Sequence, residues 1–224
     1  MSRSPLSCAL LLGLALASSS CAEPGGEAEA TTWPDGTAVA LGPIPISRAE
    51  LEEVADALAV VNPINTRRSL RREALIAQLL PRAAARLDAG DEAERSRALA
   101  EVGLAVLRDE RDGAPPQVFA RSGFATDLGF DLWSRARLLE PGSWYGPFEG
   151  IGNWFVLRAV DEPGDGVADL ETRQYHLEWA AWTFVPPKWG AAESEELCRR
   201  YGVQAIQPEL ADLIPFTYRR PNGS

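Results

Sequence analysis

The sequence predicts an α+β protein, with an N-terminal helical region followed by a small antiparallel sheet and flanking helices. Apolar residues recur at helical spacing as far as about residue 111. Six of the seven tryptophans lie after residue 130, where short strand-like runs alternate with turns. The segment DGAPPQ, residues 112–117, is typical of a linker and separates the two regions.

The composition is that of a soluble globular protein. The chain has 224 residues, 46% hydrophobic and 24% charged, which suits one large domain or two small ones. Its net charge of −10 argues against a nucleic-acid partner, because phosphate binding needs a basic surface. The one basic cluster is interpreted as a solvated helix face: Arg67, Arg68, Arg71 and Arg72.

The N-terminus is interpreted as a signal peptide, residues 1–20, followed by a flexible tether, residues 21–36. An apolar run from Leu6 to Ala17 is too short to span a bilayer and precedes Ser-Ser-Ser-Cys. This pattern favours acylation of Cys21, which would anchor the protein to a membrane, with the outer membrane of the cell envelope preferred. The alternative is ordinary cleavage after Ala22 and release into the periplasm.

The first ordered elements are expected at Val39–Leu41 and Ile44–Ile46, two short extended segments around a Gly-Pro turn. Ser47 followed by Glu50 predicts a capping box at the start of a helix. A second helix is expected from about Thr66 to Asp88, kinked or split at Pro81, because proline lacks the N–H that the helix needs.

A third helix is expected from about residue 91 to Arg111, with Asp91 and Glu94 as its capping signal. The second half then offers strand candidates at residues 144–148, 154–160 and 175–185, and a short helix at 193–201. Residues 206–218 mix helical and extended signals and receive no assignment.

The residue inventory predicts neither a metal site nor a cofactor. His176 is the single histidine, and no cysteine pair has zinc-ligand spacing. If the signal is removed and Cys21 is acylated, Cys198 remains alone, so no internal disulfide is available.

Two stretches resemble the PpiC-type parvulin peptidyl-prolyl isomerases, in the arrangement of SurA-like periplasmic chaperones. The first, within residues 37–112, runs from TAVALGPIPISRAEL to RREALIAQLL and is similar to the N-terminal chaperone segment. The second, within residues 118–162, combines DLGF, LEPGSWYGPFE and WFVLRAVDE, and is similar to a parvulin turn, central loop and closing strand. Residues 170–224 would supply a strand and a helix that complete the fold.

The departures from the parvulin pattern concern catalysis. Phe155 stands where the closing strand of the family carries a histidine, and the opening strand with its "H-I-L" motif is missing upstream. RQYHLEWA, residues 173–180, is similar to that motif, so we expect a displaced opening strand that pairs with residues 154–160. In related chaperones the N-terminal helices pack with a helix from the far end of the chain, and Glu193–Tyr201 is the candidate here.

The resemblance implies a folding factor that binds extended polypeptide clients with weak or no isomerase activity. His176 is the one candidate catalytic residue, although a strand residue satisfied by a backbone carbonyl is the simpler interpretation. The candidate client-binding residues are aromatic, with core packing as their alternative role: Phe130, Trp133, Trp144, Tyr145, Trp154, Phe155 and Trp179. An active isomerase with a remodelled site, an accessory subunit that docks one partner, and a helical lipoprotein with a small β-rich tail are the competing hypotheses.

Overall fold

The computed structural model describes residues 32–160 and 174–219. The predicted signal peptide, Cys21 and most of the tether lie outside the described residues, as do residues 161–173 and 220–224. In the part of the chain that is described, no helix is both long enough and apolar enough to cross a membrane.

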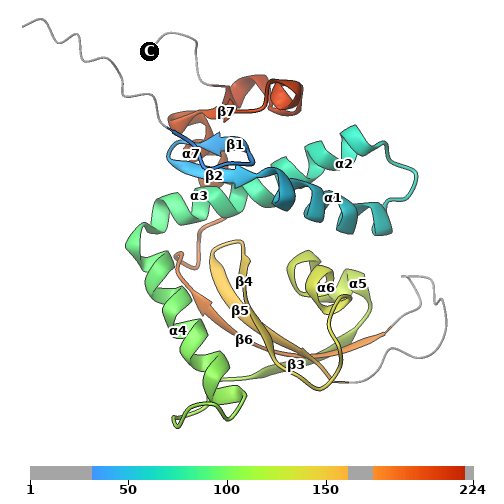
Figure 1. The fold of residues 1–224 in the computed structure, drawn as a ribbon, viewed down its shortest axis with the longest axis vertical. Helices are drawn as coiled ribbons and strands as arrows, with labels where there is room; N and C mark the ends of the chain where they lie inside the picture. Colours follow the sequence, from blue (N-terminus) through green and yellow to red (C-terminus); the bar gives the residue numbers. More distant parts are fainter. Residues whose placement is uncertain (1–31, 161–173, 220–224) are drawn as a thin grey trace, which may run out of the picture. The chain divides into compact units, whose positions relative to one another are not determined.

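The predicted α+β class is confirmed, with helices and two antiparallel sheets (Figure 1). The strands are β1 (Thr37–Leu41), β2 (Ile44–Ser47), β3 (Phe119–Gly123), β4 (Tyr145–Gly150), β5 (Asn153–Ala159), β6 (Tyr175–Thr183) and β7 (Val203–Ala205). The α-helices are α1 (Arg48–Val61), α2 (Arg67–Glu73), α3 (Leu80–Ala89), α4 (Asp91–Leu107), α5 (Ala125–Leu128), α6 (Phe130–Ala136) and α7 (Ala191–Tyr201). A π-helical segment η1 (Ala74–Leu79) and two 3-10 helices, η2 (Pro208–Leu213) and η3 (Phe216–Tyr218), complete the list.

The smaller sheet joins the two ends of the described chain. Its strand order is β2-β1-β7, so the central strand β1 pairs with its sequence neighbour and with a strand from the C-terminal end. Figure 1 shows these C-terminal elements in red beside the blue N-terminal strands. All five residues of β1 are buried, and α7 packs on α3, which confirms the expected packing of a far-end helix on the N-terminal helices.

Of the two local signals in the N-terminal helices, the capping box at Ser47 behaves as predicted. The Ser47 hydroxyl accepts from the Glu50 N–H at 3.1 Å, and a Glu50 carboxylate oxygen accepts from the Ser47 N–H at 2.8 Å. The helical run is not broken at Pro81: α2, the π-helical segment η1 and α3 follow one another directly, and the backbone at Leu79 and Leu80 is right-handed helical. Pro81 lies in the first turn of α3, just after the π-helical residues, so the loss of its N–H coincides with a change of hydrogen-bond pattern instead of a break.

The start and end of the third helix differ from the prediction. Gly90, with φ of 53°, occupies the N-cap position of α4, and no side chain caps the helix. Asp91 is instead the first helical residue, where its negative charge stabilises the helix by interacting with the positive end of the helix dipole. The helix ends at Leu107, earlier than expected, and Asp109 follows with φ of 58°.

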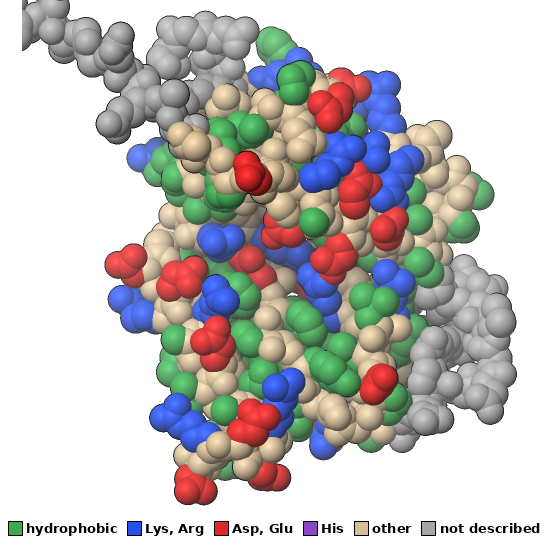
Figure 2. Space-filling model, in the orientation of Figure 1, with side chains coloured by type: hydrophobic (Ala, Val, Ile, Leu, Met, Phe, Trp, Pro, Cys, Tyr) green, Lys and Arg blue, Asp and Glu red, His purple; other side chains and the backbone are tan. Residues whose placement is uncertain are grey.

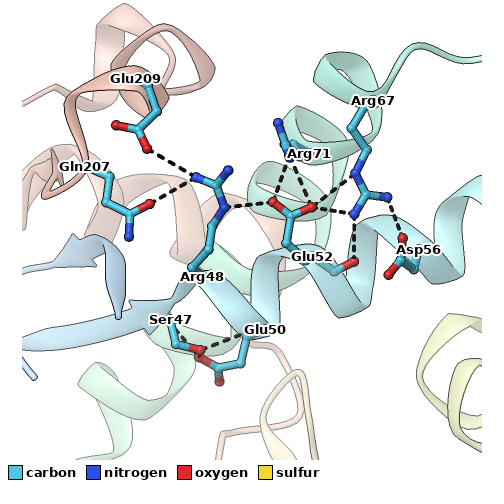
Figure 3. A network of polar contacts seen from close by, with 9 residues as sticks. All are labelled: Ser47, Arg48, Glu50, Glu52, Asp56, Arg67, Arg71, Gln207 and Glu209. Atoms are coloured by element: carbon cyan, nitrogen blue, oxygen red, sulfur yellow. Dashed lines mark hydrogen bonds and ion pairs between the residues drawn. The ribbon is translucent and has the colours of Figure 1, made fainter. Parts of the chain in front are cut away.

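An ion-pair network ties α2 and the C-terminal segment to α1 (Figure 3). The Glu52 carboxylate lies between Arg48 (2.8 Å), Arg71 (2.9 Å) and Arg67. Burial by itself would raise the pKa of Glu52, but hydrogen bonds from Arg71 and Arg67 outweigh that effect and hold the pKa below its ordinary value. Arg48 also donates to the Gln207 side chain at 3.0 Å, which links α1 to the segment that begins η2.

The arginine cluster is only partly the solvated face that the sequence suggested. Beyond the two arginines bound to Glu52, Arg68 pairs with Asp212 of η2. Arg72 is exposed. Three of the four guanidinium groups therefore hold α1, α2 and η2 together.

The larger sheet has the strand order β3-β6-β5-β4 and is covered on both faces. The helix α4 packs on β4, β5 and β6, and α6 packs on β5. The expected pairing of residues 173–180 with residues 154–160 is present, since β6 runs antiparallel to β5, with Leu157 opposite Trp179. The edge strand β3 was not predicted, because its sequence FARSG is exposed at four of five positions and lacks an alternating pattern.

Candidate functional site

Phe155, at the position where a parvulin-like site would carry a histidine, is part of the hydrophobic core. Its side chain is 3% exposed and belongs to a cluster that includes Trp133, Leu157 and Leu177. The ring of Phe148 lies 5.7 Å from its own ring at a tilt of 47°, a favourable aromatic contact. A side chain in this environment supplies apolar bulk and no proton donor or acceptor to a rotating amide.

His176 lies on the opposite face of the sheet from Phe155. Ala159 pairs with Leu177 and Phe155 pairs with Ala181, so Phe155 shares a face with the odd-numbered residues of β6. His176 is exposed, and its Nδ1 lies 2.6 Å from the Ser122 hydroxyl oxygen on β3. The Ser122 hydroxyl is thus one partner of this imidazole. The structure does not bring the two positions together.

Four of the predicted client-binding aromatics are buried. Trp133, Trp144, Trp154 and Phe155 are between 1% and 8% exposed. The indole N–H of Trp154 donates to the Ala93 carbonyl at 2.9 Å, which attaches β5 to the start of α4. These side chains build the core, so contact with a client would require the domain to open.

The remaining predicted aromatics are accessible in part. Phe130 is half-buried, packs against the core clusters on both sides of it and lines a pocket between α1 and α6. Tyr145 and Trp179 are also half-buried, and both lie on the four-stranded sheet.

A row of apolar side chains crosses all four strands of the sheet on one face. Phe119 on β3 lies opposite Trp179 on β6. Trp179 in turn lies opposite Leu157 on β5, and Leu157 lies opposite Tyr145 on β4. Phe119 stacks on Trp179 with ring centroids 5.7 Å apart and an interplanar angle of 29°. We call Phe119, Trp179, Leu157 and Tyr145 the aromatic row.

The aromatic row is partly accessible to a ligand. Leu157 is fully buried in its middle, whereas Phe119 is 41% exposed at one end. Sequence reasoning missed Phe119, because the strand that carries it was not recognised. Rigid aromatic side chains on a sheet offer a large contact area at a low entropic cost, so the row suits the side chains of an extended polypeptide.

Cys198 lies on α7 and is buried in the cluster that surrounds the smaller sheet. Burial raises the pKa of the Cys198 thiol to about 11, so this sulfur stays protonated and is a poor nucleophile. Within residues 32–160 and 174–219, no group of three or more His, Cys, Asp or Glu side chains is placed to hold a metal ion.

Comparisons with protein-family models, with curated proteins and with solved structures found no match to this chain.

Proposed function

We propose that the chain is a folding factor of the parvulin and SurA-like type that has lost its isomerase centre and binds extended polypeptides. The observation that carries the proposal is the replacement at Phe155. The position that needs an imidazole holds a hydrocarbon ring buried in the core, and the only imidazole of the chain lies on the other face of the sheet.

Two further features support this proposal. The pairing of β6 with β5 is the arrangement that a displaced opening strand requires. The packing of α7 on α3, with β7 beside β1, gives the N-terminal helices the far-end partner expected of a SurA-like chaperone. The aromatic row then supplies an accessible apolar surface for a client.

We also propose export and attachment to the envelope through a lipid on Cys21, on the grounds of the apolar run and the Ser-Ser-Ser-Cys motif. Metabolic labelling with a fatty acid, followed by mass spectrometry of the mature N-terminus, tests this point. A Cys21→Ser variant should lose the label. A mature protein that begins after Ala22 without any lipid would refute the anchor and leave the folding function open.

The function is tested by two assays on the same preparation. Cis–trans isomerisation of a proline-containing tetrapeptide should proceed at its uncatalysed rate, because the site has no group to steer the amide. Aggregation of a chemically denatured client protein should be suppressed. Phe119→Ser should weaken the suppression, whereas Leu99→Ser should not, since Leu99 is an exposed leucine on α4, outside the row.

The outcomes separate the competing functions. Faster isomerisation that disappears in His176→Ala would show an active isomerase with a remodelled site. Capture of one stoichiometric partner, with no effect on aggregation, would show an accessory subunit. If the protein neither accelerates isomerisation nor suppresses aggregation, the proposal is refuted.

A further inference from the structure

The strand β3 lies at an edge of the larger sheet. In the strand order β3-β6-β5-β4 it pairs with β6 on one side, and no other described strand lies beside it (Figure 1). Four of its five residues are exposed: Phe119, Ala120, Arg121 and Ser122. The outward backbone groups of such an edge form a template on which another extended chain can pair.

The pairing pattern shows which backbone groups of β3 face the open edge. The Val160 N–H donates to the His176 carbonyl at 2.9 Å, so the backbone groups of His176 point toward β5. Because this direction alternates along a strand, Glu178 also points toward β5, away from β3. The residues opposite these two on β3 are Ser122 and Ala120, whose N–H and C=O groups therefore point outward. No turn, loop or cap in the described part of the chain bonds to these groups.

The side chains on one face of β3 bring the aromatic row to this edge. Phe119 and Arg121 are two residues apart, so both lie on the face that carries Trp179. Figure 2 shows hydrophobic side chains at the surface over the larger sheet, with charged side chains beside them. Arg121 has no ion-pair partner within residues 32–160 and 174–219. A strand added at the edge would thus place one side chain beside Phe119 and another, two residues away, beside Arg121.

The chemistry of this edge selects its occupant. Main-chain hydrogen bonds form with any sequence, so the addition of a strand suits a protein that binds many extended clients. Opposite Phe119 an apolar side chain continues the aromatic row, and opposite Arg121 an acidic side chain forms a favourable pair, whereas a basic one is repelled. A second copy of this chain fits less well. Stable dimers bury about 1,200–2,000 Å², which is more than the edges of two five-residue strands offer.

We propose that an extended client polypeptide binds as an additional strand beside β3. This inference rests on the proposed function, since it states how the client of the aromatic row is held. The client residues opposite Ala120 and Ser122 exchange backbone hydrogen bonds with β3. The client residues opposite Phe119 and Arg121 are apolar and acidic, and their N–H groups point away from β3.

The probe is the heptapeptide Ser-Leu-Thr-Glu-Thr-Leu-Ser, labelled with fluorescein and blocked at both ends. Its sequence is the same in both directions, so the glutamate can lie opposite Arg121 and a leucine opposite Phe119 in either orientation. N-methylation of both threonines removes the N–H groups that face Ala120 and Ser122. It should weaken binding to the full chain, measured by fluorescence anisotropy, at least about tenfold. N-methylation of both leucines is the matched control and should leave the affinity nearly unchanged, because those N–H groups point away from β3.

Two positions on the protein test the same contacts. Ala120→Pro removes an outward N–H and leaves the hydrogen bonds to β6 in place, as an edge strand allows, so it should weaken binding at least about threefold. Ala120→Ser keeps the N–H and should bind as the wild type does. Arg121→Glu should reverse the charge preference, so that a peptide with lysine in place of glutamate binds more tightly than the original. Circular dichroism and urea unfolding verify that each variant is folded, and the methylated peptides need only the wild-type protein.

The methylated peptides decide the outcome. A loss of affinity that is confined to threonine methylation supports strand addition. No binding of the unmodified peptide to the wild type, or an equal effect of both methylations, overturns it. A concentration-dependent dimer in sedimentation velocity that Ala120→Pro dissociates, without any peptide binding, would show that the edge pairs with a second copy and would also overturn it.

The aggregation assay keeps this result separate from the proposed function. If the wild type suppresses aggregation but both methylated peptides bind alike, the folding function stands and strand addition is not its mode of binding. If the wild type fails to suppress aggregation but threonine methylation still weakens peptide binding, strand addition stands and the folding function falls.

Discussion

Substituting Gly103 by alanine should destabilise the protein, against the usual preference for alanine in a helix. Gly103 is buried in α4, where the helix faces β6. A Cβ atom at this position would lie 2.3 Å from Cζ2 and 2.6 Å from Cη2 of Trp182. Atoms in ordinary contact are about 3.5–4.0 Å apart, so the indole ring would have to retreat by more than about 1 Å.

The size of the effect follows from two opposing terms. Alanine in place of glycine favours a helix interior by about 1 kcal/mol. Overpacking of a filled core costs about 1–3 kcal/mol. Trp182 cannot move freely, because it packs against two core clusters that contain Trp154 and Leu104. The expected net result is a loss of about 1 kcal/mol, the difference between the overpacking cost and the propensity gain.

Urea unfolding of wild type, Gly103→Ala, Trp182→Leu and the double variant measures both terms in one cycle. With leucine at position 182 the clash is gone, so adding Gly103→Ala should stabilise the protein by up to about 1 kcal/mol. The change in unfolding free energy caused by Gly103→Ala should thus be negative in the wild-type background and positive in the Trp182→Leu background. Stabilisation by Gly103→Ala in the wild-type background would refute the packing of Trp182 on α4.

Three further predictions concern the helix end, the buried acid and the C-terminus. Asp109→Gly should raise the free energy of unfolding by about 0.5–1 kcal/mol, because glycine adopts a positive φ without a Cβ clash; a lower melting temperature would contradict this. Burial raises the pKa of Glu149 above its ordinary value of 4.5, so the folded protein binds the carboxyl proton more tightly than the unfolded chain does. The free energy of unfolding of the wild type should therefore fall as the pH rises from 4.5 through the raised pKa. Glu149→Gln should lack that fall, and the unfolding free energies of the two proteins, measured over a pH series, should diverge in favour of the variant. Truncation after Tyr201 removes β7 and η2, so the amide protons of β1 should lose protection in hydrogen exchange; unchanged protection would show that β7 is dispensable.

Local signals predicted the elements well. The capping box at Ser47 depends on residues three positions apart, so it could be read from a few neighbouring residues. The π-helical segment before Pro81 could not, because it continues the helix where the missing N–H of proline suggested a kink or a split. Strands β4, β5 and β6 were also found, because their apolar runs are bounded by turns. By contrast, β3 is a strand because it pairs with β6, and its own residues give no such pattern.

The burial of the aromatics could not be predicted. Alternation in β5 places Trp154 and Phe155 on opposite faces, but it does not say whether either face is covered. Here α4 covers one face and α6 part of the other, so both side chains are in the core.

The position of β1 between β2 and β7 has a consequence for how the chain is made. Arg48 and Gln207, joined by a hydrogen bond beside this sheet, are 159 positions apart. A ribosome releases the N-terminal strands long before the segment that completes their sheet, so β1 emerges with one edge open. Folding of the smaller sheet therefore waits until β7 has been translated, and a product that stalls before β7 leaves an unprotected strand edge that favours aggregation.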